Sequence, residues 1–193
     1  RLLLLPVRSL TGTYRWVTCP HLIERYRRDL CRAALAPRPT VPSVQVGAAL
    51  AAGGGNLFLE ERQFAIGGEP DSGLVEAIAP LVLHAETQGR LAEQLTVLGD
   101  DDFAWFVRYA LSVQARNVLE DGTKKSKNLW YEETLPPDTV MYSLAMGRSQ
   151  EAFSALDDLF PEGDPYLQAG GNETVGQGWF AVTVRRGGDG GAG

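Results

Sequence analysis

The chain has 193 residues, of which 44% are hydrophobic and 22% charged, so it is long enough to fold as one compact domain around an apolar core. Its formal net charge of -6 excludes a generally basic nucleic-acid-binding coat, although a local basic stripe is compatible with that sum. Two cysteines exclude a disulfide-rich secreted scaffold and indicate a reducing cytoplasm, and no apolar run approaches the roughly 20 residues that cross a bilayer.

The start of the chain predicts two strands and a helix. Residues 2–10 and 14–17 flank a short turn, which predicts a hairpin with Arg8 and Ser9 near that turn. Thr18 is the predicted N-cap of a helix whose apolar residues face the core. Several arginines share another face of this helix, which is either solvated or faces RNA. These arginines are Arg25, Arg28 and Arg32.

The middle of the chain alternates between irregular and regular segments. Residues 36–55 predict a long loop, because they are rich in prolines, alanines and glycines and their apolar residues follow neither a helical nor a strand spacing. A strand or bent hairpin follows over 57–66, and then a helix from Asp71 to about His84 with a kink at Pro80. The remaining predicted elements are a strand at 95–98, a helix from 100 to 110, a strand at 140–146, a helix at 149–160 and a flexible tail at 187–193.

Residues 116–129 depart from this globular pattern. They are polar, with Asp121-Gly122 as a hairpin turn and lysines on the returning arm, and an aromatic and acidic run follows them. A projecting hairpin of this kind is suited to insert between nucleotides and stack on bases. The alternative is an exposed hairpin that its lysines keep soluble. The candidate RNA-binding residues here are Arg116, Lys124, Lys125, Lys127, Trp130 and Tyr131.

Residues 170–178 form a glycine-rich loop between two predicted strands, at 166–169 and 179–184. Such a loop is able to turn successive N–H groups toward an anion. No helix follows the glycines and no Gly-Lys-Ser/Thr ends them, which excludes a dinucleotide fingerprint and a P-loop. A tight hairpin without a ligand remains the alternative. The candidate binding residues are Gly170, Gly171, Asn172, Thr174, Gly176 and Gly178.

This order of short strands and crossing helices predicts an α+β fold of the ferredoxin-like or RRM-like kind, with helices on one side of a sheet. Residues 1–186 are expected to form one RNA-binding domain, because aromatic strand ends and basic loops suit single-stranded RNA. A stand-alone RRM-like module without catalytic activity is one alternative. A small-molecule enzyme is another, although no convergent acid, base or nucleophile accompanies the glycine loop.

Three stretches together resemble one family. They are Leu-Pro-Val-Arg-Ser-Leu at 5–10 with Trp-Val-Thr-Cys-Pro at 16–20, Leu-Trp-Tyr-Glu-Glu-Thr-Leu-Pro at 129–136, and residues 167–178. In this order they resemble the RAMP-superfamily backbone subunit of the type III-B (Cmr-type) CRISPR effector complex, an antiviral ribonucleoprotein. The resemblance implies that copies of the chain stack along a CRISPR RNA as a filament, together with other Cmr-type subunits, and that the intact protein cleaves complementary target RNA.

The resemblance also implies a role for each stretch. The hairpin over about 113–135 would be a thumb that presses between guide nucleotides, and the glycine loop would lie against the guide backbone near Arg8 and Ser9. The family cleaves RNA with a divalent metal, Mg²⁺ or Mn²⁺, and an aspartate near the start of the intact protein. That region, with the first strand and helix, is expected to precede Arg1. No catalytic residue or metal ligand is therefore assigned in this sequence.

Overall fold

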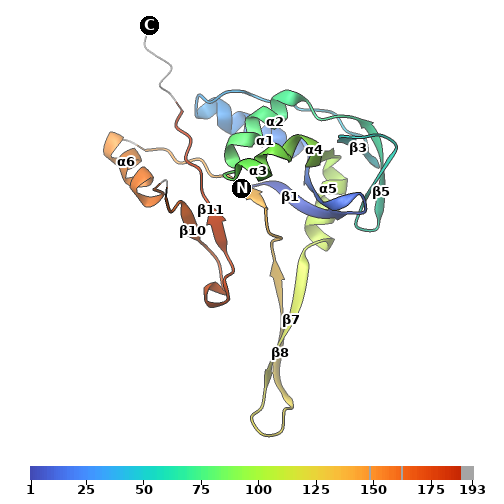
Figure 1. The fold of residues 1–193 in the computed structure, drawn as a ribbon, viewed down its shortest axis with the longest axis vertical. Coiled ribbons are helices and arrows are strands. Elements are labelled where there is room, and N and C mark those ends of the chain that lie inside the picture. The colour runs from blue at the N-terminus through green and yellow to red at the C-terminus, as the bar shows by residue number, and fades with distance from the viewer. Residues whose placement is uncertain (148, 162, 188–193) are drawn as a thin grey trace.

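The computed structural model describes residues 1–147, 149–161 and 163–187. Two hairpins of different length project from a rounded body of sheet and helices, and they leave it in the same direction (Figure 1). Except for Gly187, the predicted tail at 187–193 lies outside the described residues. In the described part of the chain, no helix is long and apolar enough to span a bilayer.

A seven-stranded mixed sheet forms the body, in the order β2-β6-β3-β5-β4-β1-β9. Because β1 also pairs with β2, the first six of these strands close on themselves like a barrel. The pairs β2–β6 and β3–β5 are parallel and the other neighbours are antiparallel. The strands are β1 (Leu2–Ser9), β2 (Gly12–Thr18), β3 (Ala48–Ala51), β4 (Asn56–Leu59), β5 (Arg62–Gly68), β6 (Leu95–Leu98) and β9 (Val140–Met141).

Two core clusters lie on opposite faces of this sheet, because successive strand residues point in opposite directions. One cluster takes side chains from each of the six barrel strands and from α5 (Asp100–Tyr109), including Val17 and Phe106. The other packs helices against β1, β2 and β6 around Trp16. Those helices are α1 (Pro20–Arg32), α2 (Ser72–Ile78) and α4 (Leu91–Gln94). The mixed α+β class is confirmed, but α5 packs into the first cluster, on the face opposite the one that α2 and α4 cover.

Several predicted boundaries are wrong in detail. The N-cap of α1 is Cys19 rather than Thr18, which belongs to β2. The predicted loop at 36–55 contains β3, and the helix predicted from Asp71 to His84 ends at Ile78, before a 3-10 turn around Pro80 (η1, Ala79–Leu81). A separate short helix follows, α3 (Ala85–Gly89). Proline has no N–H to continue a helix, so the change at Pro80 is a break and not a kink.

The last part of the chain forms a helix and a short hairpin. Ser149 caps α6 (Gln150–Leu159) by accepting a hydrogen bond from the Ala152 N–H at 3.4 Å. The strands β10 (Tyr166–Gln168) and β11 (Trp179–Ala181) then pair antiparallel on either side of the glycine loop. The predicted strand at 140–146 is present only as the two residues of β9.

Candidate nucleic-acid interface

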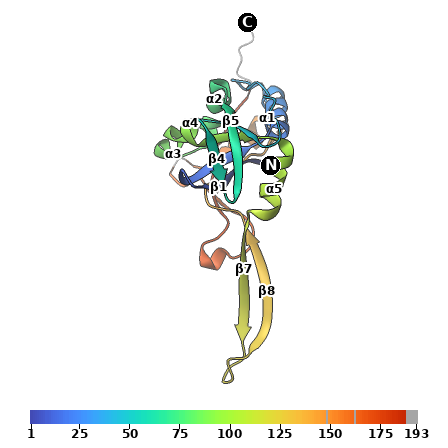
Figure 2. The same cartoon turned by 90° about the vertical axis from the view of Figure 1, so that its right-hand side faces the viewer.

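The long hairpin consists of β7 (Ser112–Leu119) and β8 (Ser126–Thr134), which pair antiparallel from Ser112–Thr134 at the root to Leu119–Ser126 near the tip. It follows α5 directly and extends away from the body in both views (Figures 1 and 2). The hairpin forms a separate two-stranded sheet, so neither of its faces is covered by further strands. A ribbon of this kind has little stability of its own in water and gains from contact with a partner.

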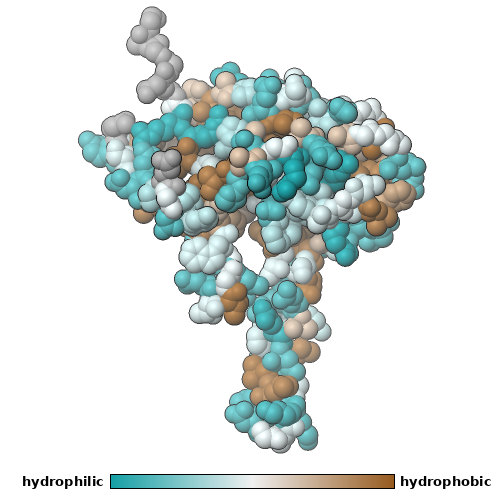
Figure 3. Space-filling model, viewed as in Figure 1, coloured by the Kyte–Doolittle hydropathy of each residue, from teal (hydrophilic) through white to brown (hydrophobic). Residues whose placement is uncertain are grey.

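Apolar and aromatic side chains are exposed along this hairpin. A hydrophobic band lies on it just before its hydrophilic tip (Figure 3), where Val118, Leu119 and Leu129 are each 44% or more exposed. Nearer the root, Trp130 is 38% and Tyr131 69% exposed. Exposed aromatic rings on a projecting ribbon are available to stack on nucleobases.

All three lysines of the protein lie at the tip of this hairpin, at Lys124, Lys125 and Lys127. Their ammonium groups make no hydrogen bond or ion pair with any residue that the structure describes. Glu120 and Asp121 offset two of the three charges, so the tip is only weakly basic overall. The unpaired lysines are free to neutralise phosphates of a bound nucleic acid.

The glycine loop is a self-supporting turn. The N–H groups of Val175, Gly176 and Gln177 donate to carbonyls within the loop, over a 3-10 turn, η2 (Glu173–Val175). These three amides are therefore not available to an anion, which favours the tight-hairpin alternative for this part of the loop. Gly178 has φ +78° and an added Cβ would lie 2.3 Å from the Ala169 carbonyl oxygen, which requires glycine there. Gly170 and Gly176 also have positive φ, whereas Gly171 does not, and Thr174 is exposed.

One carboxylate joins the glycine loop to the hairpin. Glu132 accepts hydrogen bonds from Trp130 Nε1 at 2.9 Å, from Arg116 Nε at 3.0 Å and from Asn172 Nδ2 at 3.0 Å. These hydrogen bonds, first that from Trp130, hold the pKa of Glu132 below its usual value. Three predicted site residues thus meet at a residue that was not selected from the sequence. The signal in the sequence was weak, because Glu132 lies 40 residues from Asn172.

Arg8 and Ser9 lie at the C-terminal end of β1, and their side-chain hydrogen bonds within the described residues go to Glu60 and Thr11. The Arg8 guanidinium forms an ion pair with Glu60, with Nη2–Oε2 at 2.5 Å and Nε–Oε2 at 3.0 Å, and Ser9 Oγ lies 3.1 Å from Thr11 Oγ1. Arg8 also borders a cleft of about 540 Å³ at the root of the hairpin. Two residues that sequence reasoning missed, Trp105 and Tyr109 of α5, line the same cleft with ring centroids 5.4 Å apart. Their spacing of four residues on a helix was the available signal.

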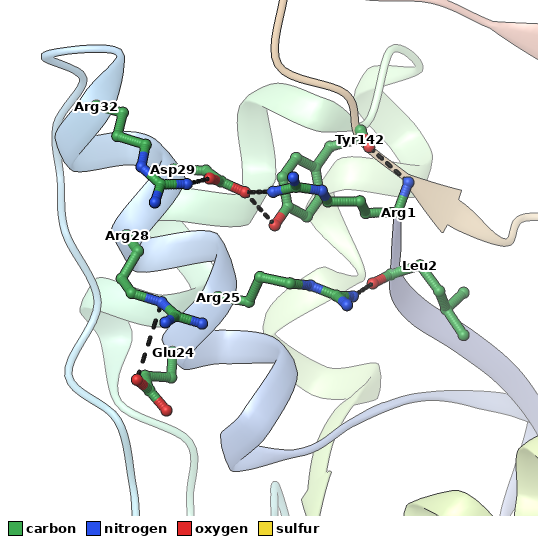
Figure 4. A network of polar contacts seen from close by, with 8 residues as sticks. All are labelled: Arg1, Leu2, Glu24, Arg25, Arg28, Asp29, Arg32 and Tyr142. Carbon is green, nitrogen blue, oxygen red and sulfur yellow. Dashed lines mark hydrogen bonds and ion pairs between the residues drawn. The ribbon is translucent and has the colours of Figure 1, made fainter.

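The arginine face of α1 lies beside a polar network that joins this helix to the start of β1 and to Tyr142 (Figure 4). Arg25 donates to the Leu2 carbonyl at 3.1 Å, Arg28 lies 3.9 Å from Glu24, and Arg32 pairs with Asp29 at 3.0 Å. Asp29 is buried and also accepts hydrogen bonds from Arg1 and from the Tyr142 hydroxyl. Arg25 therefore links α1 to β1, whereas Arg28 and Arg32 pair only within the helix and stay more than half exposed.

Two features of the described residues bear on nucleophilic and metal chemistry. Burial raises the pKa of the Cys19 thiol to about 12, so this cysteine is not a thiolate nucleophile near neutral pH. No group of three or more His, Cys, Asp or Glu side chains in the described ranges is arranged to hold a metal ion. The residues present therefore do not fit the divalent metal that the resemblance implies for the intact protein.

Comparison with known proteins identifies relatives of the whole chain. No family model matches. The CRISPR system Cmr endoribonuclease Cmr4 of Pyrococcus furiosus is 32% identical over 198 residues, which cover 96% of this chain and 67% of that protein. The crystal structure of oligomeric Cmr4 from P. furiosus superimposes with a TM-score of 0.72 at 28% identity, over 96% of this chain and 71% of that one.

Two further structures have the same fold. A crystal structure of Cmr4 matches with a TM-score of 0.66 at 28% identity, over 93% of this chain and 68% of that one. A chain of the type III-B Cmr-beta complex bound to cognate target RNA matches with a TM-score of 0.60 at 18% identity, over 92% of this chain and 65% of that one. The identity, coverage and shared fold together show that this chain belongs to the Cmr4 family.

Proposed function

We propose that this chain is a CRISPR RNA-binding backbone subunit of a type III-B (Cmr-type) effector complex. Membership of the Cmr4 family supports this function, because the P. furiosus relative is described as part of the CRISPR Cmr system. The observation that carries it in this chain is the projecting hairpin, with unpaired lysines at its tip and exposed aromatic rings nearer its root. Lysines that neutralise phosphates and rings that stack on bases are the two components of single-strand RNA binding.

We propose further that the hairpin is the thumb of a RAMP-type domain and that the body is a variant of the ferredoxin-like or RRM-like fold. The segment β1–β2–α1, a hairpin followed by a helix packed on the sheet, supports this finer class. In this arrangement Lys124, Lys125 and Lys127 contact guide phosphates and Trp130 or Tyr131 stacks on a base. The glycine loop, with Asn172 and Thr174 exposed, approaches the RNA beside them.

The contribution of this chain to cleavage is positional. The P. furiosus relative is named an endoribonuclease, and a Mg²⁺ or Mn²⁺ ion bound by the intact protein would supply Lewis-acid chemistry. No described residue here is assigned to that ion. Arg116, the lysines and the aromatic rings instead hold the RNA backbone, and fixing a 2′-hydroxyl in line with its phosphate is itself a large part of such a reaction.

The proposed partners are CRISPR RNA, complementary target RNA, further copies of this chain and other Cmr-type subunits, in the cytoplasm. The oligomeric P. furiosus structure and the target-bound Cmr-beta complex support this assembly by relationship. A head-to-tail contact between identical chains that does not close into a ring produces an open filament, as a backbone along an RNA requires.

The test is size-exclusion chromatography with light scattering on the chain mixed with single-stranded RNAs of increasing length. A filament subunit binds in a number of copies that grows in steps with RNA length. A stand-alone RRM-like module gives a complex of fixed stoichiometry at low protein excess. Absence of RNA binding, together with binding of a nucleotide that Gly176→Val abolishes, would support the small-molecule enzyme instead.

A further inference from the structure

Glu132 connects the two projecting hairpins, β7–β8 and β10–β11. It lies on β8, on the same face of the strand as Trp130, and its side chain is only 22% exposed. Its two carboxylate oxygens accept from three donors, which come from β7, from β8 and from the glycine loop. The neighbouring carboxylate, Glu133, points to the other face and makes no hydrogen bond or ion pair within the described ranges.

We propose that Glu132 is a positioning residue that fixes the glycine loop against the hairpin and orients Arg116, so that loop and hairpin form one RNA-binding surface. This inference rests on the proposed function and adds to it a residue that makes no RNA contact of its own. A carboxylate at an RNA-binding surface would otherwise weaken binding, because it repels phosphates. Its three hydrogen bonds give a reason for its presence there.

The conformation of Asn172 supports this role. Asn172 has φ 63° and ψ 30°, in the left-handed region, which glycine adopts at the least cost and asparagine more readily than other residues. Glycine is frequent in this loop, yet here the chain carries an amide side chain. That amide donates to Glu132, a contact that glycine cannot make. The left-handed backbone and the hydrogen bond together account for asparagine at this position.

Arg116 is held in a way that leaves its binding groups available. It donates to Glu132 through Nε, and neither Nη1 nor Nη2 makes a hydrogen bond with any described residue. The side chain is 38% exposed. A guanidinium that is fixed at Nε presents its terminal nitrogens in a defined direction, as bidentate recognition of a phosphate requires. The gain in RNA binding from a fixed Arg116 therefore outweighs the repulsion between the Glu132 carboxylate and the phosphates.

The decisive experiment measures the affinity of the full chain for a single-stranded guide-length RNA by fluorescence anisotropy, with Glu132→Ala compared with Glu133→Ala. Simple electrostatics predicts that removing either negative charge strengthens binding. The positioning role predicts that Glu132→Ala weakens it by roughly tenfold, whereas Glu133→Ala leaves it equal or slightly stronger. Glu132→Gln keeps one acceptor oxygen and should recover part of the loss. Equal strengthening by both alanine variants would overturn the inference.

A coupled substitution tests the contact between Glu132 and the loop. Asn172→Gly keeps the left-handed backbone but deletes the donor. Contacting residues give non-additive effects, so the double variant with Glu132→Ala should bind no more weakly than Glu132→Ala alone. If the loss of RNA affinity in the double variant equalled the product of the two single losses, the two residues would act independently and the inference would be contradicted.

Hydrogen exchange of the free protein separates this inference from the proposed function. Glu132→Ala and Asn172→Gly should each speed amide exchange in residues 170–178, while Glu133→Ala should not. Faster exchange in a protein that binds no RNA would retain the link between loop and hairpin but refute the proposed function. RNA binding by the wild-type chain with unchanged exchange in the variants would refute the inference alone.

Discussion

The lysines at the hairpin tip provide the most direct test of RNA binding. Replacing Lys124, Lys125 and Lys127 by alanine removes every lysine of the chain. It breaks no hydrogen bond or ion pair that a lysine side chain makes with the described residues. On a single-stranded nucleic acid, each phosphate contact contributes about 0.7 to the slope of log affinity against log salt. Three contacts therefore reduce the slope by about 2. A rise from about 50 to about 200 mM salt then weakens the wild-type chain about 18-fold more than the variant.

The assay is a salt titration of RNA affinity by fluorescence anisotropy, with thermal unfolding as a check that the variant is folded. Arg27, Arg28 and Arg38 are exposed arginines away from the hairpin, and their replacement by alanine is the matched control because it removes the same charge. The control should keep the wild-type slope. An unchanged slope in the lysine variant, or a loss of slope in the control, would refute the assignment of RNA binding to the hairpin.

Further predictions concern stability. Tyr142→Phe removes the 2.9 Å hydrogen bond to Asp29 and should lower the free energy of unfolding by about 1.5–3 kcal/mol in urea titrations, as expected for a bond to a charged group. Burial opposes ionisation of Asp29, but hydrogen bonds from Tyr142 and Arg1 outweigh it and lower the pKa below 3.8. The resulting stabilisation is complete above pH 3.8 and is lost as pH falls through the lowered pKa. Asp29→Asn should therefore reduce the dependence of the free energy of unfolding on pH in this acid range. Gly178→Ala should speed hydrogen exchange throughout residues 170–178, because its Cβ would clash with the Ala169 carbonyl, whereas Gly171→Ala, with open space around it, should not.

Local patterns were sufficient for the elements that depend on near neighbours. The Asp121-Gly122 dipeptide predicts where the long hairpin reverses. The connection is nevertheless wider than a two-residue turn, because strand pairing ends at Leu119–Ser126 and residues 120–125 form the loop. The acidic start and apolar spacing of residues 100–110 predict α5 for the same kind of reason. Motifs spread along the chain also sufficed to indicate its family, which the comparisons confirm.

Elements that depend on distant partners were missed. The strand β3, with sequence Ala-Ala-Leu-Ala, has little intrinsic preference for extended structure. It is a strand because it pairs with β5 and β6 and buries Ala49 and Ala51 completely. The closure of the barrel through β1 and β2 likewise follows from pairing and not from any local pattern.

The sequence by itself determined the α+β class, the long hairpin with its lysines, the glycine loop and the family, because each depends on short-range spacing of residue types or on motifs. Only the tertiary structure decided how the candidate residues are used. It pairs Arg8 with Glu60, joins Arg25 to the Leu2 carbonyl, and brings Asn172 to Glu132 across 40 residues. Such contacts arise when packing places distant segments side by side, and no local period in a chain encodes which carboxylate a distant amide will meet.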